Sequence, residues 1–465
     1  MKWAIYNVLF LFVYPLLLPG FLVRMLRRGG YAARMCDRIA LYPEAVRREF
    51  ASVRGAEGFV WVHAVSVGEV QVAGRLMKEW REAEPGVRFC FSTTSSTGWR
   101  TAEKVVSDRD VLIYNPLDFP TFVKAALLTV RPRAIVMTES EIWPNFIRRA
   151  AKMRIPLFLV NARVSDRSAP RYRAARIFFG DVFRCFARIF AQSDLDAERI
   201  RATYPRGASG GDASDNISVT GSFKFDAAAR NEAKERELRE WITGGGAPSS
   251  AGRILLGGST WPGEDEVLLD IYREIASSGG DALLVIAPRH FEKADAVEAN
   301  VRAAGFRCVR RSRGDRGGDA RGAVFLADTT GELMGLYGIA DAVFVGKSLC
   351  ARGSQNMIEP CLCGKPTFVG PHTENFRPVM SDLLSARAIV QVEDAAELKA
   401  RLVAIFRGGS AAQDAKALGE RARKAVERRR GVVARCVAEA RSLVQAAQGQ
   451  RIAAGPPPQG GGSHE

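Results

Sequence analysis

Short apolar runs that alternate with helical patterns fill the chain from residue 58 onward, in two successive series. The first series predicts strands at 58–63, 87–92, 111–114, 133–138, 156–160, 187–191 and 217–220, and the second at 253–258, 282–287, 307–310, 323–326, 342–346, 366–369 and 388–391. Strands that alternate with helices form a parallel sheet covered on both faces. The chain is therefore predicted to be an α/β protein of two Rossmann-like, doubly wound domains facing a cleft, which is the default ligand site of such a pair.

The domain boundaries follow from changes in composition. A charged run (NEAKERELRE) and a Gly/Ser/Pro-rich run (TGGGAPSSAG) occupy 226–252, which is predicted to be a linker. We expect an N-terminal domain at 29–225, a C-terminal domain at 253–447 that ends in helical patterns at 393–407 and 411–447, and a disordered tail at 448–465. The arginine-rich stretch 310–322 is predicted to be a solvated, mobile loop.

An uncharged stretch of 21 residues, 3–23, opens the chain. Roughly 20 apolar residues span a bilayer core, so the sequence predicts a membrane anchor at 1–28. Arginines follow the stretch and place the body on the cytoplasmic side; they are Arg24, Arg27, Arg28 and Arg34. Pro15 and Pro19 leave a kinked or shallow interfacial helix open. A cleaved signal peptide fits poorly, because only Lys2 precedes the apolar run.

The net charge of 67 − 51 = +16 requires an anionic partner. The apolar N-terminus favours an anionic membrane surface over nucleic acid. The basic run 421–430 is either a solvated helix face or a contact with lipid headgroups. The eight cysteines are scattered and there are only four histidines, so neither a disulfide framework nor a metal site is expected. The two D-x-D triplets, at 108–110 and 194–196, are not expected to bind metal.

Two motifs of the first series carry polar groups at strand ends. In HAVSVGE, Ser66 and Gly68 suit a tight turn, and Glu69 falls in the first turn of the next helix. There it is either a capping carboxylate or a general base. In TESEIWPN, Glu139 and Glu141 follow a strand and could hold an acceptor's hydroxyl or amine groups. The alternative is that they cap the helix that begins near Pro144.

The second series has several polar loops at strand ends. Arg289 suits forked recognition of a phosphate. The stretch 345–360 reads VGKSLCARGSQNMIEP, a flexible loop opening a helix at about Asn356, and a helix start is a ready anion site. Glu359, one turn in, could accept hydrogen bonds from ribose. Together these features predict a nucleotide-sugar site. A P-loop and a Rossmann G-x-G-x-x-G are both absent, which argues against an NTPase and a dehydrogenase.

Ordered sequence blocks give a more specific indication. The blocks WVHAVSVGEV, STTSSTGW, YNPLDFP, TESEIWPN, NARVSDRS, VTGSFKFD, GGSTWPGEDE, APRH, DTTGELMGLYGIADAVFVGKS, RGSQNMIEP and GPHTENF run from the anchor to about residue 440. This set resembles the 3-deoxy-D-manno-octulosonic acid (Kdo) transferases of lipid A biosynthesis. The resemblance implies a two-domain GT-B glycosyltransferase of the inner membrane, with its catalytic body on the cytoplasmic side.

The resemblance also implies substrates and site residues. The N-terminal domain would bind the lipid A precursor lipid IVA, and the C-terminal domain CMP-Kdo, in an inverting reaction without a metal or other cofactor. Glu69 matches the catalytic base of H-A-x-S-x-G-E, with Ser66, Gly68, Glu139 and Glu141 on the acceptor side. The segments that contact CMP match Pro288, Arg289, Gly331, Glu332, Leu333, Asn356, Met357, Ile358 and Glu359. A base on one domain and a donor on the other imply that domain closure assembles the site.

The chain departs from the family pattern before the donor helix. Ser354 and Gln355 stand where Gly-His is usual, and Lys347 stands where a second glycine is usual. These changes leave open a membrane-anchored GT-B transferase that uses another nucleotide sugar. A non-enzymatic scaffold would predict that Glu69→Ala affects no transfer. The number of Kdo residues added, the acyl pattern of the acceptor and the oligomeric state are not decided by the sequence.

Overall fold

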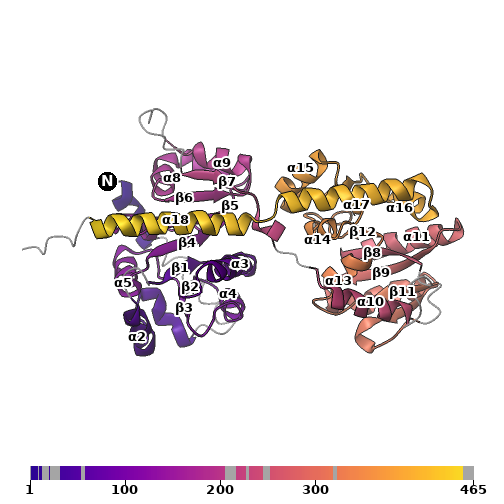
Figure 1. Cartoon of the computed structure of the whole chain (residues 1–465), viewed down its shortest axis with the longest axis horizontal. Coiled ribbons are helices and arrows are strands. Elements are labelled where there is room, and N and C mark those ends of the chain that lie inside the picture. Colours follow the sequence, from indigo (N-terminus) through magenta and orange to yellow (C-terminus); the bar gives the residue numbers. More distant parts are fainter. Residues whose placement is uncertain are drawn as a thin grey trace, which may run out of the picture. The chain divides into compact units, whose positions relative to one another are not determined.

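The computed structural model describes residues 2–8, 10–12, 20, 32–53, 58–204, 216–226, 230–244, 252–317 and 322–453. The chain forms two compact units. Unit 1 consists of residues 1–223 and 431–465, and unit 2 of residues 224–430 (Figure 1). The chain therefore passes from one unit to the other twice.

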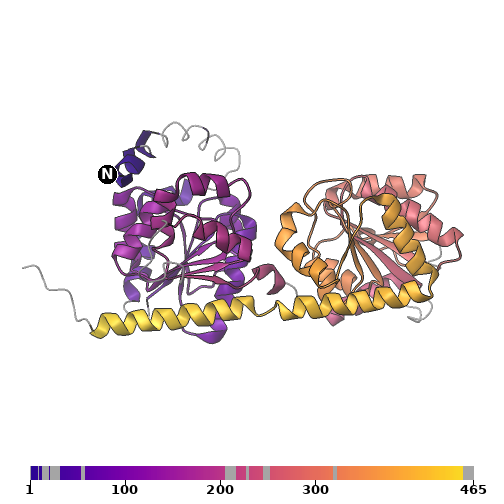
Figure 2. The same ribbon diagram turned by 90° about the horizontal axis from the view of Figure 1, so that it is seen from above.

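Unit 1 is built on a parallel seven-stranded sheet of order β3-β2-β1-β4-β5-β6-β7. Its strands are β1 Val60–His63, β2 Phe89–Thr93, β3 Val111–Tyr114, β4 Ala134–Thr138, β5 Leu157–Ala162, β6 Arg188–Ala191 and β7 Ile217–Val219. Its helices are η1 Ala32–Ile39, α2 Glu44–Ser52, α3 Val67–Ala83, α4 Ser96–Ala102, α5 Pro120–Val130, α6 Pro144–Lys152, α7 Ala169–Ala174, α8 Arg176–Phe183, α9 Asp194–Arg201 and α18 Val432–Ala453. Helices cover both faces (Figure 2), so the strands are buried on both sides and read as continuous apolar runs.

Unit 2 repeats this architecture with the sheet order β10-β11-β9-β8-β12-β13-β14. Its strands are β8 Arg253–Thr260, β9 Ala282–Pro288, β10 Arg307–Arg310, β11 Ala323–Leu326, β12 Ala342–Val345, β13 Thr367–Val369 and β14 Val390–Gln391. Its helices are α10 Glu232–Thr243, α11 Glu264–Ser277, η5 Phe291–Lys293, α12 Ala294–Ala303, η6 Arg311–Arg313, α13 Leu333–Ile339, α14 Ile358–Leu362, η7 Glu374–Phe376, α15 Arg377–Ser385, α16 Ala395–Arg407 and α17 Ser410–Arg428. The short helix η3 Phe223–Asp226 lies at the boundary between the units.

All fourteen predicted strands are present, and no strand end differs from its prediction by more than two residues. In the middle of each sheet the strand order reverses, between β1 and β4 in unit 1 and between β8 and β12 in unit 2. In open α/β sheets ligands bind outside the carboxyl ends of the strands at such a reversal. The fold therefore directs attention to the loops after β1, β4, β8 and β12.

The predicted domain boundaries need three corrections. The predicted linker 226–252 contains α10, which buries Leu238, Trp241 and Ile242 in the core of unit 2. The predicted helix 411–447 is broken between Arg428, where α17 ends, and Val432, where α18 begins. Gly431 in this break has a φ of +75°, and α18 belongs to unit 1. Residues 431–447 are therefore not part of the C-terminal domain. The start of the predicted tail at 448 is also wrong, because α18 continues to Ala453.

Most of the predicted anchor 1–28 lies outside the described residues. Residues 2–8 and 10–12 are helical and pack on unit 1. The Tyr6 hydroxyl donates to Asp118 Oδ2 at 3.0 Å, and the rings of Phe10 and Phe119 lie 5.0 Å apart. Within the part of the chain that the structure describes, no helix combines the length and the apolar character needed to cross a membrane.

Candidate active site

The turn between β1 and α3 holds Glu69 at the start of a helix. Ser66 is the N-cap of α3, and its hydroxyl oxygen accepts the N–H of Glu69 at 3.3 Å. In return, Oε1 of Glu69 accepts the Ser66 hydroxyl at 3.0 Å, and Oε2 accepts the N–H of Val65 at 2.9 Å. This reciprocal arrangement is a variant of the capping box in which Glu69 accepts the N–H of the residue before the N-cap, so the structure shows the capping role of Glu69. Gly68 is exposed and Glu69 is half-buried, which leaves the carboxylate accessible to solvent.

The start of α4 supports this turn from the side. Ser95 donates its hydroxyl to the Val65 carbonyl at 2.9 Å. A Cβ atom on Gly98 would lie 2.6 Å from the same carbonyl oxygen and 2.4 Å from Thr93 Oγ1, so only glycine allows this approach. The sequence analysis did not select these residues as part of the site. The signal was present in the block STTSSTGW, which follows the strand beside β1.

Glu139 and Glu141 follow β4, which lies beside β1 in the sheet, so the structure brings the predicted acceptor-side residues to one edge. Oε1 of Glu139 accepts the Asn161 side-chain amide at 3.1 Å. Oε2 of Glu141 accepts the Trp143 indole N–H at 3.1 Å and lies 3.7 Å from Nε2 of His63. His63 is fully buried, its Nδ1 lies 2.9 Å from Ser92 Oγ, and its Nε2 has no hydrogen-bond partner among the described residues.

The alternative in which Glu139 or Glu141 caps the helix near Pro144 is wrong. The cap of α6 comes from Asp118, in the connection between β3 and α5. Its carboxylate accepts the N–H groups of Asn145 at 3.0 Å and Phe146 at 2.8 Å. Because Asp118 fills this role, the two glutamates remain at the edge of the sheet.

In unit 2, one cavity of about 160 Å³ collects five of the nine predicted donor residues. They are Pro288, Arg289, Gly331, Glu332 and Leu333, and Ser259 and Thr329 also line the cavity. Parallel strands end at the same edge of a sheet, so the loops after β8, β9 and β11 meet there. Arg289 is exposed, and its guanidinium has no hydrogen-bond or ion-pair partner among the described residues. A free guanidinium at the rim of a polar cavity suits a phosphate.

Glu332 is the buried acid of this cavity, and other side chains already occupy it. Arg311 donates Nη2–H to Oε1 at 2.9 Å, Thr329 donates its hydroxyl to Oε2, and Lys234 Nζ lies 3.5 Å from Oε1. Burial raises the pKa of Glu332, but the bonds from Arg311 and Thr329 outweigh it, so the pKa lies below its usual value. Glu332 therefore fixes the loop as a carboxylate. Because Arg311 is part of this network, the start of the predicted mobile loop 310–322 is ordered.

The remaining predicted donor residues, 356–359, do not line this cavity. Met357 and Ile358 are fully buried in the core of unit 2, so only their backbone could face a ligand. Asn356 donates its side-chain amide to Oε1 of Glu359 at 2.9 Å and accepts the N–H of Ile358 at 3.1 Å. The helix α14 begins at Ile358 and has five residues. It is too short for the anion-binding helix start that the sequence predicted.

Glu264 is a structural centre of unit 2 that the sequence analysis missed. Its side chain is fully buried at the start of α11. Oε2 accepts the N–H groups of Trp261 and Lys347, each at 2.8 Å. Oε1 accepts the N–H groups of Ser348, Leu349 and Cys350 at 3.1, 3.1 and 3.4 Å. One carboxylate thus holds the loop after β12 against the end of β8. The sequence block GGSTWPGEDE contains Glu264, but it does not indicate which backbone N–H groups the carboxylate binds.

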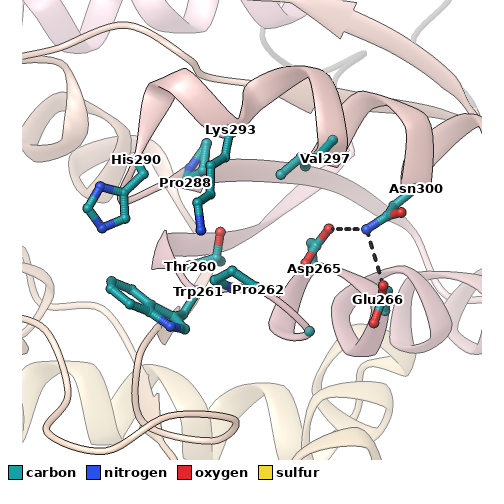
Figure 3. Close-up of a pocket in the computed structure, with 12 residues that line it drawn as sticks. Thr260, Trp261, Pro262, Asp265, Glu266, Pro288, His290, Lys293, Val297 and Asn300 are labelled. Carbon is teal, nitrogen blue, oxygen red and sulfur yellow. Dashed lines mark hydrogen bonds between the residues drawn. The ribbon is translucent and has the colours of Figure 1, made fainter.

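A second pocket, of about 110 Å³, lies on the other side of the turn after β9. Figure 3 shows Trp261, His290 and Lys293 around it, with Asn300 bonded to Asp265 and Glu266. The rings of Trp261 and His290 meet edge to face at 5.0 Å, and Lys347 Nζ lies 4.9 Å from the centre of the Trp261 ring. Pro288 lines both this pocket and the donor cavity. Lys347, which stands where the family usually has a glycine, therefore packs against Trp261 in an ordered part of unit 2.

The described residues contain no group of three or more His, Cys, Asp or Glu side chains that could hold a metal ion. In the D-x-D triplets, Asp110 pairs with Arg81, and Asp196 lies in the capped first turn of α9, where Ser193 accepts its N–H. Asp110 and Asp196 thus have structural roles.

Comparisons with known proteins agree with the sequence blocks. A family model described as 3-deoxy-D-manno-octulosonic-acid transferase (kdotransferase) matches residues 33–227. The 3-deoxy-D-manno-octulosonic acid transferase of Haemophilus influenzae is 29% identical over 402 residues, covering 86% of this chain and 89% of that protein. The protein of the same description from Bordetella pertussis is 32% identical over 344 residues, covering 72% of this chain and 76% of that protein.

A solved structure identifies the fold more broadly. The UDP-GlcNAc 2-epimerase from Neisseria meningitidis, bound to UDP-GlcNAc, aligns with 83% of this chain and 99% of its own, with a TM-score of 0.54 and 12% sequence identity. At this identity the likeness concerns the fold alone. With its two parallel seven-stranded sheets covered by helices, the chain has the GT-B fold.

Proposed function

The chain belongs to the 3-deoxy-D-manno-octulosonic acid transferase family, and we propose that it transfers Kdo from CMP-Kdo to the lipid A precursor lipid IVA at the cytoplasmic face of the inner membrane. The observation that carries the proposal is the polar cavity of unit 2, where Arg289 presents an unpaired guanidinium beside the loop 329–333. A free guanidinium beside a fixed polar loop is suited to binding the phosphate of a nucleoside monophosphate.

The proposed reaction is a direct displacement at the anomeric carbon of Kdo. Glu69 removes the proton from the acceptor hydroxyl while its oxygen forms the new bond to that carbon. The bond to the CMP phosphate breaks, and CMP leaves with the electron pair. The configuration at the carbon is therefore inverted. Arg289 stabilises the charge that develops on the departing phosphate, and the displacement uses no metal or other cofactor. Since Glu69 belongs to unit 1 and Arg289 to unit 2, the reaction needs both units.

The capping box does not prevent Glu69 from acting as a base. Each of its oxygens accepts one hydrogen bond, from Ser66 or from Val65. A carboxylate has about four lone-pair sites, so acceptor capacity remains on both oxygens. The same two bonds hold the carboxylate in place before the acceptor arrives, which is how a fixed base gains in efficiency. Glu139 and Glu141, at the same edge, would hold the acceptor's polar groups.

The N-terminal segment supports the membrane part of the proposal. One face of the helical residues 2–8 and 10–12 packs on the rest of unit 1, and the other exposes large apolar side chains to solvent; these are Ile5, Val8, Leu11 and Phe12. An acceptor with acyl chains is reached most directly from a membrane surface. We therefore place unit 1 at that surface.

The direct test is mass spectrometry of lipid IVA incubated with the purified protein and freshly made CMP-Kdo. Gains of one, two or more Kdo units establish the activity and the number transferred. Glu69→Gln should lower turnover about 10²- to 10⁴-fold, the usual contribution of a general base, while CMP binding is retained. This variant keeps the cap, because the amide oxygen can accept the Val65 N–H. Glu82→Gln, an exposed change on the same helix, is the matched control.

Two outcomes would count against the proposal. Near wild-type turnover of Glu69→Gln would remove Glu69 as the base. No mass gain, with an intact donor and a working Kdo transferase in parallel, would favour a transferase that uses another nucleotide sugar. The segment around Gln355, whose N–H donates to the Gly346 carbonyl at 3.1 Å, would then be the first place to look for the changed specificity.

A further inference from the structure

A cationic pocket lies in unit 1, on the helix α6 that follows the β4 edge residues described above. It has a volume of about 170 Å³. Its lining residues are Asn7, Pro120, Asn145, Arg148, Arg149 and Lys152. Four of them belong to α6 at spacings of three and four residues, so they share one face of that helix. Three of the six are cationic and none is acidic.

Two cations of this pocket, Arg149 and Lys152, form no ion pair with the described residues, whereas Arg148 interacts electrostatically with Asp181. Nε of Arg149 is buried and makes no hydrogen bond, and Lys152 makes no ion pair. The guanidinium of Arg148 lies over the ring of Trp3, 3.8 Å from its centre. Burial lowers the pKa of Arg148. An anion that enters the pocket therefore meets Lys152 and the guanidinium of Arg149 without displacing a carboxylate.

The carboxylate of Asp118 does not supply that anion. Both oxygens of Asp118 are engaged, by the N–H groups of Asn145 and Phe146 and by the Tyr6 hydroxyl. The Asn145 side chain donates to the Asp118 carbonyl and, at 2.8 Å, to Asn7. Asp118, Asn145 and Asn7 are thus hydrogen-bonded to one another, whereas Arg149 and Lys152 have no ion-pair partner among the described residues.

The surroundings of the pocket indicate which kind of anion it takes. Asn7 belongs to the helical segment whose other face exposes Ile5, Val8, Leu11 and Phe12. Lys2 of the same segment donates to the carbonyl of Ile177, a side chain that is 65% exposed. Apolar surface beside a cationic pocket matches an amphiphile whose anionic head is a phosphate, because guanidinium groups bind phosphate oxygens in a forked geometry.

We propose that the pocket formed by Arg148, Arg149 and Lys152 binds the phosphate group of a membrane lipid. Two sources offer this chemistry, namely a bulk anionic phospholipid and the phosphorylated acceptor of the proposed reaction. The site itself does not depend on which sugar is transferred. Only the binding of the acceptor's phosphate at this site rests on the proposed function.

The test uses the full chain with Arg149→Gln and Lys152→Gln combined, leaving Arg148 to pack on Trp3. The matched control is Lys104→Gln with Arg109→Gln, which removes the same charge from exposed positions of unit 1. Binding is measured by co-sedimentation with phosphatidylcholine vesicles and with vesicles of equal parts phosphatidylcholine and phosphatidylglycerol. At about 1 kcal/mol for each cation near an anionic surface, the pocket variant should bind the phosphatidylglycerol vesicles about 30-fold more weakly than wild type.

Each outcome has a distinct meaning. Weaker binding of the pocket variant alone identifies bulk phospholipid as the source. Unchanged vesicle binding, with a raised KM for lipid IVA and unchanged CMP affinity, identifies the acceptor phosphate. An equal loss in the pocket variant and the control shows diffuse charge attraction and overturns the proposal, and so does no change in any assay. Arg149→Lys, which keeps the charge, should recover part of the binding. Thermal unfolding of each variant excludes misfolding, since Arg149 has no partner to lose.

Discussion

Replacing Glu264 by glutamine changes one oxygen of a fully buried carboxylate into an amino group. The two oxygens accept five backbone N–H groups, two on Oε2 and three on Oε1. A glutamine amide has one acceptor oxygen. Whichever way the amide is oriented, at least two N–H groups then face a nitrogen that cannot accept them, and no water reaches the site to replace the lost acceptor, because the side chain is fully buried.

The size of the effect follows from these contacts. A hydrogen bond to a charged acceptor contributes about 1.5–3 kcal/mol, so the loss of two lowers the free energy of unfolding of unit 2 by about 3–6 kcal/mol. Domains are usually stable by only about 5–15 kcal/mol. Glu264→Gln should therefore remove a large part of the stability of unit 2. Glu266→Gln is the control, since Glu266 is exposed and bonds only to Asn300 among the described residues.

Hydrogen exchange read by mass spectrometry is the assay, because it reports the loop itself. In Glu264→Gln, the amides of Lys347, Ser348 and Leu349 should lose protection first. CMP binding should weaken at least about 10-fold. This follows because Oε2 of Glu264 also accepts the N–H of Trp261, two residues after Ser259, which lines the donor cavity. Wild-type protection of these amides, together with a stability loss below about 1 kcal/mol in urea, would refute the reasoning.

Three further changes test other parts of the two units. Arg289→Ala should raise the Kd for CMP about 10- to 100-fold by calorimetry without lowering the Tm, since the side chain is exposed and unpaired; an unchanged Kd would remove Arg289 from the donor site. Gly98→Ala places a Cβ atom 2.6 Å from the Val65 carbonyl oxygen, so turnover should fall at unchanged CMP affinity, whereas a parallel loss of both would indicate unfolding. Burial raises the pKa of Asp118 to about 6, so its proton is held more tightly in the folded protein than in the unfolded chain. Its contribution to stability should therefore fall by about 3 kcal/mol as the pH rises from about 4 to above 6; urea denaturation of wild type and Asp118→Asn across this range should show a difference that changes with pH.

The strands could be predicted from the sequence because each is buried on both faces. In β1 (VWVH) and β8 (RILLGGST) this gives short runs without polar alternation, bounded by polar loops. The convergence of Pro288 and Arg289 with Gly331 could be predicted for a related reason. The two segments follow β9 and β11, which are neighbours in one parallel sheet, so the carboxyl ends of these strands lie at the same edge.

The roles of particular carboxylates could not be predicted, because they depend on partners far away in the sequence. Glu264 holds a loop that begins at Lys347, and Asp118 caps a helix that begins at Pro144. The sequence around Glu264 or Asp118 does not indicate which distant residues each carboxylate binds. Glu332 shows the reverse case. Its position beside the donor cavity was predicted, but Arg311 occupies its carboxylate, so its part in binding is to fix the loop.

The end of the C-terminal domain could not be predicted from local sequence patterns either, as the packing of α3, the helix that carries Glu69, shows. The buried side of α3 packs against Val432, Cys436 and Val437 of α18. The spacing of these residues indicates an amphipathic helix, but it does not say which of the two sheets the helix covers. The tertiary core decides this, because α18 completes the apolar layer over unit 1. Loss of the residues after Gly431 would therefore expose the core beneath the base-bearing helix, although they follow the donor-binding unit in the chain.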